Sequence, residues 1–575
     1  MARSRCTALP CRLELLEARR MLTTIVTENT YHTQAMLQTE LAALAGAFPE
    51  IAELFVIGQS EQGRDLFGLR ISDNVGVEED EPEVKFAGPV HGDEPVGQAA
   101  LLYWADELLH GYGVDPRLTE IVDETDIVIL PQLNPDGYRL GRRTNINFID
   151  LNRNYPEGSA PNDIGTIYDG DPLLDAGRQA ETRAVMQFSA GESFALSLNM
   201  HGGALVANYP YDSDGMGSVY SATPDDDLFK ELALAYSTPN TPMYSSNVFP
   251  QGITNGADWY EVKGGMQDWN YRYLSDFEIT IEISNTKKPP STTLTNYYDD
   301  NRESLTAYAE FVHKGLRGLV TDAATGDELY AKVSVIGGSY GTGQPVYTDP
   351  DVGDYHRLLL PGTYDLLIES EGYEPQTITG VSVAGGPTTR LDVALQAIDT
   401  TPPTVLASDF DIDAPLPTVT MQFSEPVSFN PDRLLIQNVD TGSYHHDAKA
   451  GFDWIDSQTI GFYVDARVLP NGNYEARLFG SLIFDAAGNA MTTNPVEPFF
   501  ILAGDANRDR VVDLADFVLL RNNFAAGSLF SEGDFNFDDQ IDLEDFVVLR
   551  NNFGQSVPSL LPGDGDDDDD RSFFG

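Results

Sequence analysis

The chain has 575 residues, with 90 acidic against 35 basic side chains and a formal net charge of −55. A length of this order predicts about three to five domains, and so acidic a chain is a poor match for nucleic acid or an anionic membrane, which both require a basic face. Cationic ligands, including metal ions and basic peptides, are favoured instead, although acidic surfaces also occur simply as an adaptation for solubility.

The two cysteines, Cys6 and Cys11, precede the first segment that is expected to fold. The body of the protein is therefore expected to hold no disulfide, which fits a cytosolic chain and equally an exported one. Residues 1–25 are basic and lack the uninterrupted apolar core of a secretory signal. Residues 16–22, LEARRML, resemble a short leader motif of large bacterial surface proteins, with an ordinary basic amphipathic terminus as the alternative. No apolar run is long enough to predict a transmembrane segment.

Residues 26–314 alternate between helical and strand-like hydrophobic patterns, which predicts one α/β domain of about 290 residues. Helices are expected over residues 31–47, 96–109 and 302–314, the last two ending at Gly111 and Gly315. Strands are expected over residues 51–71 (two strands), 84–90 (ending at His91), 126–131, 194–200 and 277–283.

The helical pattern ends at residue 314, and the rest of the chain is predicted to form smaller modules. Residues 315–398 and 399–503 each show short alternating strands between Gly and Pro, the pattern of a β-sandwich, and a linker at 400–404 marks their boundary. Residues 504–555 hold two copies of one acidic motif. Residues 556–575 include five consecutive aspartates, 566–570, and are expected to be a solvated, disordered tail.

A histidine and a glutamate three residues apart, His91 and Glu94, follow an apolar run and indicate half of a zinc site. Open α/β sheets place ligands at the carboxyl ends of their strands. His201 also ends an apolar strand, ahead of two glycines that allow close backbone approach. Catalytic zinc takes three protein ligands and leaves one position for water, so the three residues together predict a catalytic zinc site. Judged singly, a solvated turn and a structural histidine are the alternatives.

Glu282, inside the apolar strand 277–283, is the predicted general base and shares a face of that strand with Glu278 and Thr280. A glutamate there is costly unless it is paired or takes part in chemistry. The alternative is an edge strand whose polar residues face solvent. Arg142, Arg143 and Arg153 are notable in so acidic a chain, because arginine binds carboxylates through two parallel hydrogen bonds.

Six short segments carry a family resemblance: HGDE (91–94), NPDGY (134–138), DLNRN (150–154), HGG (201–203), NYPYD (208–212) and GGMQD (264–268). With them, the chain up to about Lys314 resembles the zinc metallocarboxypeptidases, specifically the regulatory branch that includes carboxypeptidases D, E, M and N. The resemblance implies a mixed sheet of about eight strands flanked by helices, with the site at its edge.

The resemblance also implies residue roles at the reacting bond. His91, Glu94 and His201 would bind one zinc ion, and Glu282 would activate the attacking water. Arg143 would stabilise the oxyanion, and it is chosen over Arg142 because it stands nine residues before Asn152.

Further roles concern the end of the substrate. Asn152 and Arg153 would hold its terminal carboxylate, which makes the enzyme an exopeptidase, and Tyr260 would close over it. Asp212 falls where members that release basic residues carry an acid in the side-chain pocket, so release of C-terminal Lys or Arg is predicted.

The following modules have resemblances of their own. Residues 315–398, with GDY (353–355), LLLPGTY (358–364) and EGY (371–373), resemble the transthyretin-like β-sandwich of the same branch. Residues 399–503, with FSEPV (423–427) and DAAGN (485–489), resemble a bacterial Ig-like module, with a plain spacer sandwich as the default.

Residues 504–555 repeat the same ligand types and the same helix pattern. Oxygen-bearing side chains stand at positions 1, 3, 5, 9 and 12 of each loop, as an EF-hand calcium loop requires. They are Asp505, Asn507, Asp509, Asp513 and Asp516, and then Asp534, Asn536, Asp538, Asp542 and Asp545. Paired loops of this kind resemble dockerin modules, which implies two structural calcium ions and a cohesin-like docking partner. An intramolecular or purely structural calcium module is the alternative, and Arg510 and Asp539 replace the glycine usual at position 6, which strains the turn.

Together these features predict an exported zinc carboxypeptidase, extracellular or associated with the cell surface, that acts on peptide or protein C-termini and has no nucleic-acid partner. Two alternatives remain open. One is a peptidoglycan stem-peptide carboxypeptidase of the same fold, and the other is a catalytically inactive adhesion or scaffold protein.

Overall fold

The computed structural model describes residues 24–156 and 177–559. Both cysteines, nearly all of the predicted leader and the aspartate run of the predicted tail lie outside these ranges. The chain divides into two compact units, Met1–Ala397 and Ile398–Gly575, which are described separately. Within the described ranges, no helix is both long enough and apolar enough to cross a membrane.

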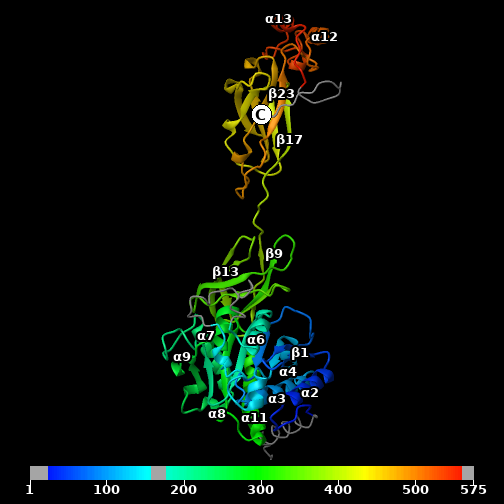
Figure 1. Cartoon of the computed structure of the whole chain (residues 1–575). Coiled ribbons are helices and arrows are strands. Elements are labelled where there is room, and N and C mark those ends of the chain that lie inside the picture. The colour runs from blue at the N-terminus through cyan, green and yellow to red at the C-terminus, as the bar shows by residue number, and fades with distance from the viewer. Residues whose placement is uncertain (1–23, 157–176, 560–575) are drawn as a thin grey trace, which may run out of the picture. The chain divides into compact units, whose positions relative to one another are not determined.

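The first unit is built on a mixed eight-stranded sheet in the order β1-β2-β4-β3-β5-β8-β6-β7 (Figure 1). Its strands are β1 (Ala52–Gln59), β2 (Asp65–Ile71), β3 (Glu83–Ala87), β4 (Asp126–Leu130), β5 (Phe194–His201), β6 (Leu205–Tyr209), β7 (Ile253–Asn255) and β8 (Phe277–Ile283). The central strands β4, β3, β5 and β8 run parallel. The predicted α/β class and strand number are confirmed.

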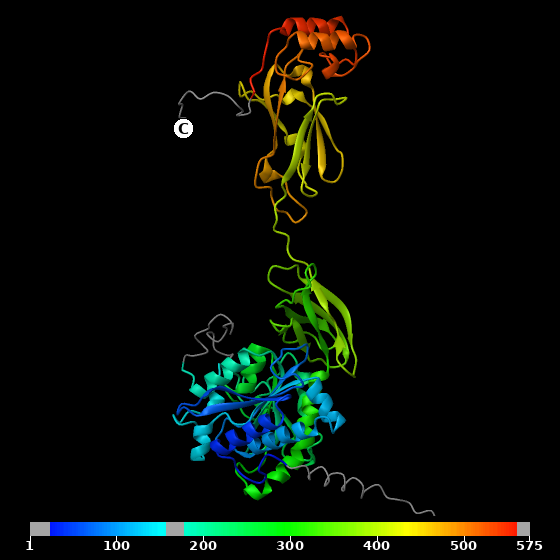
Figure 2. The same cartoon turned by 90° about the vertical axis from the view of Figure 1, so that its right-hand side faces the viewer.

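Helices cover both faces of this sheet, as Figure 2 shows. The longer ones are α2 (Gln34–Ala47), α3 (Val96–Gly111), α4 (Pro116–Asp123), α6 (Ala180–Ala190), α7 (Asp226–Ser237) and α11 (Leu294–Ala309). Strand β4 shows how the two faces arise: Ile127 and Ile129 pack into one apolar core, while Val128 and Leu130 pack into another. A parallel strand buried on both faces is therefore apolar throughout, as its sequence is.

Two predicted boundaries are wrong. Strand β3 ends at Ala87, so His91 lies in the loop beyond it rather than at the strand end. The chain turns away at Gly88, where a Cβ atom would lie 2.1 Å from the Pro131 carbonyl oxygen, and the next residue, a proline, has no N–H for the ladder.

The last helix of the catalytic fold, α11, begins at Leu294 rather than near residue 302. The first turns of α11 bury Tyr298 and Asn301. Both side chains are polar, so an apolar pattern at helical spacing does not appear in this part of the sequence. Asn301 is satisfied inside the core, since its Oδ1 accepts hydrogen bonds from Tyr236 and Asn240.

A β-sandwich of two four-stranded sheets follows in the same unit. Its strands are β9 (Leu316–Asp322), β10 (Lys332–Gly338), β11 (Val346–Tyr347), β12 (Asp354–Arg357), β13 (Gly362–Glu369), β14 (Gln376–Val383), β15 (Thr389–Arg390) and β16 (Val393–Leu395). The sandwich packs on the catalytic fold through Arg357, which is fully buried, pairs with Asp225 and lies 5.0 Å from the Phe277 ring.

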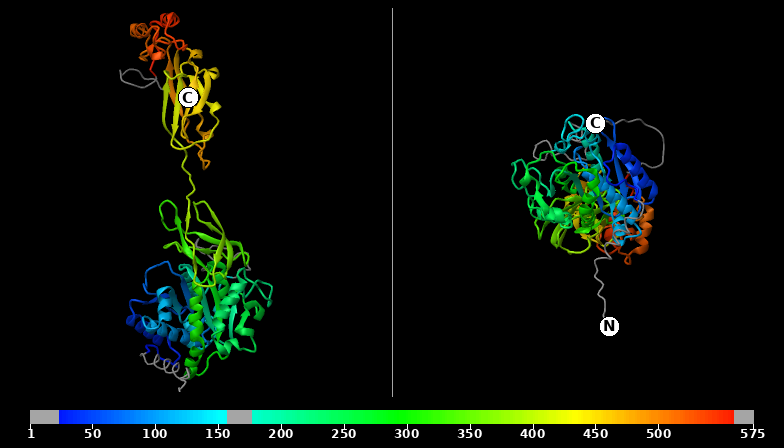
Figure 3. Two further views of the ribbon diagram at one scale, coloured as in Figure 1. Left: turned by 180° about the vertical axis from the view of Figure 1, so that it is seen from behind. Right: turned by 90° about the horizontal axis from the view of Figure 1, so that it is seen from below.

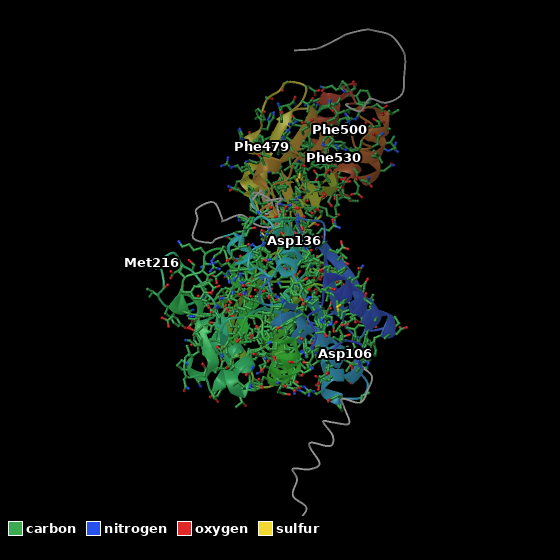
Figure 4. The ribbon with its side chains drawn as sticks, turned by 60° about the horizontal axis from the view of Figure 1, so that its bottom comes forward. Asp106, Asp136, Met216, Phe479, Phe500 and Phe530 are labelled. Carbon is green, nitrogen blue, oxygen red and sulfur yellow. The ribbon has the colours of Figure 1, made fainter. Side chains whose placement is uncertain are left out.

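The second unit contains a four-stranded and a three-stranded sheet, followed by two short helices (Figure 3). Its elements are β17 (Val405–Asp411), β18 (Thr418–Phe423), β19 (Leu435–Asn438), β20 (Lys449–Trp454), β21 (Thr459–Val464), β22 (Gly472–Arg477), β23 (Val496–Ile501), α12 (Leu514–Asn523) and α13 (Leu543–Asn552). One apolar core joins sheets and helices, with Phe500 of β23 and Phe530 between the helices both buried in it (Figure 4). The repeat is therefore not structurally independent of the sandwich before it.

Candidate metal centre and substrate site

Three sequence-distant residues meet where the parallel strands end. His201 is the last residue of β5, and the loop after the adjacent parallel strand β3 carries His91 and Glu94 to the same sheet edge. The Glu94 Oε2 atom lies 3.0 Å from His91 Nδ1 and 3.1 Å from His201 Nδ1, and the two Nδ1 atoms are 3.0 Å apart. All three side chains are buried.

This arrangement fits a divalent metal ion. Two imidazole nitrogens and one carboxylate oxygen are a donor set that catalytic zinc uses, and here all three converge on one point. Within the described residues, the polar contacts of the His201 ring are all at Nδ1, the nitrogen that faces the other two ligands, since its buried Nε2 has no hydrogen-bond partner. Burial lowers the pKa of His201 to about 4, which keeps the imidazole in the neutral form that binds metals. Although burial opposes the shift, hydrogen bonds from both histidines hold the pKa of Glu94 well below its usual range.

Further charged groups surround these ligands. Asp150 Oδ1 lies 2.9 Å from His91 Nε2, the position in which a carboxylate orients a metal-binding imidazole. Arg143 bonds Asp150 Oδ2 at 2.9 Å and Glu94 Oε1 at 3.3 Å, and Lys287 Nζ lies 2.8 Å from Glu94 Oε1. The sequence did not single out Asp150 or Lys287, although Asp150 opens the segment DLNRN.

The structure also distinguishes Arg142 from Arg143 as the candidate for stabilising the oxyanion. Arg142 turns away from the metal ligands: it donates to the Asn145 carbonyl oxygen, and its guanidinium lies 4.3 Å from the Phe148 ring centre. Arg143 alone of the pair faces Glu94.

Glu282 lies beside the ligands because β8 pairs in parallel with β5, in a register that places Glu282 opposite His201. The strand is internal, between β5 and β6, so the edge-strand alternative is wrong. Burial, and then the charge of Glu94, raise the pKa of Glu282 to about 7, and its Oε2 atom has no hydrogen-bond partner. Glu278 differs, since its carboxylate accepts from Asn199 and Asn270 in the core.

The predicted carboxylate-binding residues follow on the short turn at residues 151–153. Asn152 is buried and its Oδ1 accepts from the Met266 backbone N–H at 3.0 Å. Arg153 donates to the Asn152 carbonyl oxygen at 2.8 Å and is otherwise exposed. Tyr260 is 41% exposed, and the pKa of its hydroxyl is raised by burial and then by the charge of Glu282, which places the ring within electrostatic range of the site.

Asp212 is buried among polar side chains. Its Oδ1 accepts from Asn208 Nδ2 at 3.1 Å and from Gln267 Nε2 at 2.8 Å. Burial raises the pKa of Asp212 to about 6, while Arg153 is among the groups that lower it. A Cβ atom at Gly256 would lie 1.9 Å from Asp212 Oδ1, so only glycine fits against this carboxylate. Sequence reasoning missed Gln267 as a site residue, although it belongs to the segment GGMQD.

The repeated loops of the second unit have matching internal geometry. The carboxylate of Asp505 accepts from the N–H groups of Asp509 and Arg510, at 3.1 and 2.9 Å, and that of Asp534 accepts from Asp538 and Asp539 at the same distances. The position-12 carboxylates of Asp516 and Asp545 accept from N–H groups at positions 3 and 9 of their loops.

The two position-6 residues carry the backbone strain that was expected. Arg510 and Asp539 have φ angles of 72° and 64°, in the region that favours glycine. Within the described residues, four groups of His, Cys, Asp or Glu side chains have ligand atoms that all lie within 4.8 Å of one another, close enough to hold a metal ion. None of these four groups is in the repeated loops. Burial raises the pKa of Asp505 to about 6, in spite of the backbone hydrogen bonds that favour its ionised form.

Comparison with known proteins matches the family model described as zinc carboxypeptidase over residues 37–304 and the carboxypeptidase regulatory-like domain over residues 315–396. The chain is 38% identical over 402 residues to the carboxypeptidase N catalytic chain of Rattus norvegicus, covering 64% of this chain and 87% of that one. It is 41% identical over 368 residues to carboxypeptidase D of Homo sapiens, covering 60% of this chain and 25% of that one, so it spans about a quarter of that relative's length. Among solved structures, carboxypeptidase A from Helicoverpa armigera aligns with a TM-score of 0.42 at 20% identity, over 52% of this chain and 80% of that one.

Proposed function

Because the chain belongs to the zinc carboxypeptidase family, we propose that it hydrolyses the C-terminal peptide bond of peptides and releases a terminal Lys or Arg. The observation that carries the proposal is the convergence of His91, Glu94 and His201 beside a buried carboxylate, Glu282, with an unpartnered oxygen. A zinc ion bound by these three residues supplies Lewis acidity and lowers the pKa of water toward about 7.

Glu282 acts as the general base. Its Oε2 has no partner to displace, and its raised pKa lies near neutral pH, where a carboxylate can both accept and return a proton. It takes the proton of the attacking water and delivers it to the leaving amine. Arg143, held at the site by Asp150 and Glu94, stabilises the negative charge that develops on the carbonyl oxygen.

The substrate is positioned by its C-terminus. The exposed guanidinium of Arg153, on the same turn as Asn152, binds the terminal carboxylate through charge-assisted hydrogen bonds. Tyr260, half exposed at the rim, covers the bound residue. An internal peptide bond offers no such carboxylate, which restricts hydrolysis to chain ends.

Asp212 sets the side-chain preference. A cationic side chain that enters the pocket would pair with its carboxylate and hold it ionised, whereas an apolar side chain would leave a buried acid unmatched. Asp212 matches the acid that family members releasing basic residues carry in the side-chain pocket. This match favours basic peptides over peptidoglycan stem peptides as the substrate.

The test is hydrolysis of matched peptides that end in Arg, Leu or diaminopimelate by the wild type and by Glu282→Gln, with zinc content measured for both. We expect a preference for Arg and a loss of about 10²–10⁴-fold in kcat for the variant at unchanged zinc content. Equal activity of the two proteins would overturn the role of Glu282 as general base, and absence of hydrolysis by both would identify the inactive scaffold. A preference for the diaminopimelate peptide would identify the peptidoglycan alternative.

For the second unit we propose that each repeated loop binds one calcium ion and that the module serves an exported protein as a docking element. The matching ligand positions, the shared loop geometry and the raised pKa of Asp505 support this. Calorimetry must use the full chain, because the helices share their core with the preceding sandwich. Absence of calcium binding would remove the proposal.

A further inference from the structure

A cavity of about 290 Å³ lies within the first unit, between the catalytic fold and the β-sandwich that packs on it. Glu83, which begins β3, and Phe194, which begins β5, are part of its lining. His201, at the metal centre, ends β5. Seven steps along an extended strand span about 23 Å, so the cavity is remote from the catalytic residues and at the opposite edge of the sheet.

One wall of the cavity is strongly acidic. Five glutamates of the catalytic fold line it, Glu78, Glu79, Glu81, Glu83 and Glu192. Arg70 forms ion pairs with Glu78 and Glu192 of the wall, and its guanidinium also forms an ion pair with Asp126, which does not line the cavity. Burial, and then repulsion from Asp126, raise the pKa of Glu81 to about 8. The one arginine therefore does not offset the carboxylates of the wall, so part of the wall is protonated near neutral pH, and a bound cation would favour the ionised forms.

Glu83 provides a second and separate observation. Its side chain is only 7% exposed, and its Oε2 accepts from the Ser193 N–H at 2.9 Å. No hydrogen bond reaches its Oε1 from any residue in the described ranges, although Glu83 lines the cavity. Burial raises the pKa of Glu83 well above its usual value, and the oxygen left without a protein donor can accept a hydrogen bond from a ligand that enters the cavity.

The facing wall is aromatic. Tyr330 and Tyr347 of the sandwich stack at 5.7 Å between ring centres with an angle of 10° between their planes, and both are part of the lining. Their exposed fractions are 44% and 39%, so each tyrosine keeps part of its surface open beside the stacked contact. Asp349 and Asp354 add carboxylates at the rim. Aromatic faces opposite carboxylates favour an organic cation with an apolar stem, because the rings attract the charge and cover the stem.

We propose that this cavity binds the side chain of a basic amino acid, with its guanidinium or ammonium group at the glutamates and its stem against Tyr347. Two groups of side chains at the margin of the cavity have ligand atoms close enough together for a metal ion, Asp73 with Glu79 and Glu81, and Asp80 with Asp354 and His356. A metal ion held by either group would make no use of the aromatic wall, which favours the organic cation. The ligand has two sources, a released amino acid or a residue within a basic peptide. The site is independent of the proposed hydrolysis, although both would recognise the same side chains.

The test measures binding of Nα-acetyl-arginine amide by calorimetry to full-length, zinc-loaded Asp212→Asn. This probe has no carboxylate for Arg153, and the substitution removes the acid of the catalytic pocket. We expect one binding site, and at least tenfold weaker binding of the uncharged citrulline analogue. Tyr347→Ser and Glu79→Gln should each weaken binding about fivefold, whereas Tyr340→Ser, an exposed tyrosine of the same sandwich outside this lining, should not.

Several results of this calorimetry would contradict the proposed cation site. Absence of binding, equal binding of the citrulline analogue, or binding that neither cavity variant weakens would overturn the proposal. Binding of calcium beyond the two ions proposed for the repeated loops, with no response to arginine amide, would also overturn it and identify a metal site. Free arginine and an amidated arginine-containing peptide, compared on the same protein, then distinguish the two sources.

Discussion

The candidate zinc site and the repeated acidic loops are both candidate ion sites, but they are assembled in opposite ways. The zinc ligands come from residues 91 to 201 and meet only because β3 and β5 lie parallel and adjacent. Each loop draws its ligands from twelve consecutive residues, Asp505 to Asp516 and Asp534 to Asp545. The first site therefore depends on the whole sheet, whereas the second depends on a short stretch of chain and its own turns.

The two sites also differ in what their ligand atoms contact. At the zinc site, two imidazole nitrogens face each other across 3.0 Å, and Glu282 and His201 keep buried atoms without partners. In the loops, the carboxylates of Asp505 and Asp516 accept hydrogen bonds from the backbone of their own loop. The loops thus hold their shape through hydrogen bonds from their own backbone. At the candidate zinc site, by contrast, some buried polar atoms have no hydrogen-bond partner and two imidazole nitrogens face each other.

The largest expected effect is at the site assembled from distant strands. His201→Ala removes one of three ligands, and no neighbouring residue replaces it, so zinc affinity should fall by more than the roughly 10–100-fold that loss of a supporting group causes. Hydrolysis should fall to background. Zinc content after dialysis against a weak chelator measures this, with His446→Ala, an exposed histidine of the second unit, as the control. Retention of stoichiometric zinc by His201→Ala would show that the ligand set is different.

The next effect concerns the pocket that the same sheet assembles around Asp212. Asp212→Asn keeps the shape and removes the charge, so kcat/KM for an Arg-ending peptide should fall about 100-fold, since breaking a buried charge pair is costly. The value for a Leu-ending peptide should change little. Asp214→Asn, two residues along and exposed, is the matched control. An equal loss for both peptides would indicate that Asp212 supports the fold and does not select the side chain.

A smaller effect tests whether each loop binds its calcium ion independently of the other loop. Asp516→Ala and Asp545→Ala each remove the last ligand of one loop, so each should lower the calcium stoichiometry of the full chain from two to one. The remaining loop should keep its affinity because its ligands are all its own. Glu544→Ala, an exposed acid in the first turn of α13, controls for charge alone. Loss of both ions in either single variant would show that the loops act as one site.

This contrast explains how much could be predicted from the sequence. Ligand spacing alone predicted that the two loops repeat each other and that Arg510 and Asp539 are strained, whereas calcium binding by the loops stays a prediction. The candidate zinc ligands, Glu282 and Asp212 could be singled out because short motifs mark them and a family resemblance connects them. The partners that the fold adds, Asp150, Gln267 and Lys287, were missed, because their roles depend on strand register and loop paths that no local pattern encodes. For the same reason, the end of β3 and the start of α11 were misplaced.

The smallest expected effect is a pH dependence of stability that differs between the two units. In the first unit, burial raises the pKa of Glu81 to about 8 and that of Asp126 to about 7. The folded chain therefore holds protons that the unfolded chain releases near pH 4, and its stability should fall as pH rises from about 4 to 8. Glu81→Gln should flatten the upper part of this trend. In the second unit, Asp505, with a pKa of about 6, produces the same fall over about pH 4 to 6 without calcium.

Calcium should change the trend in only one of the two units. Ion binding requires ionised carboxylates, so with calcium present the second unit should become more stable as pH rises to about 6, while the first unit should keep its falling trend. Thermal unfolding followed by calorimetry, with and without calcium at several pH values, measures both transitions in the full chain. A reversal in both transitions would mean that calcium also binds the acidic wall of the first unit, and the distinction between a local and an assembled ion site would no longer separate the two units.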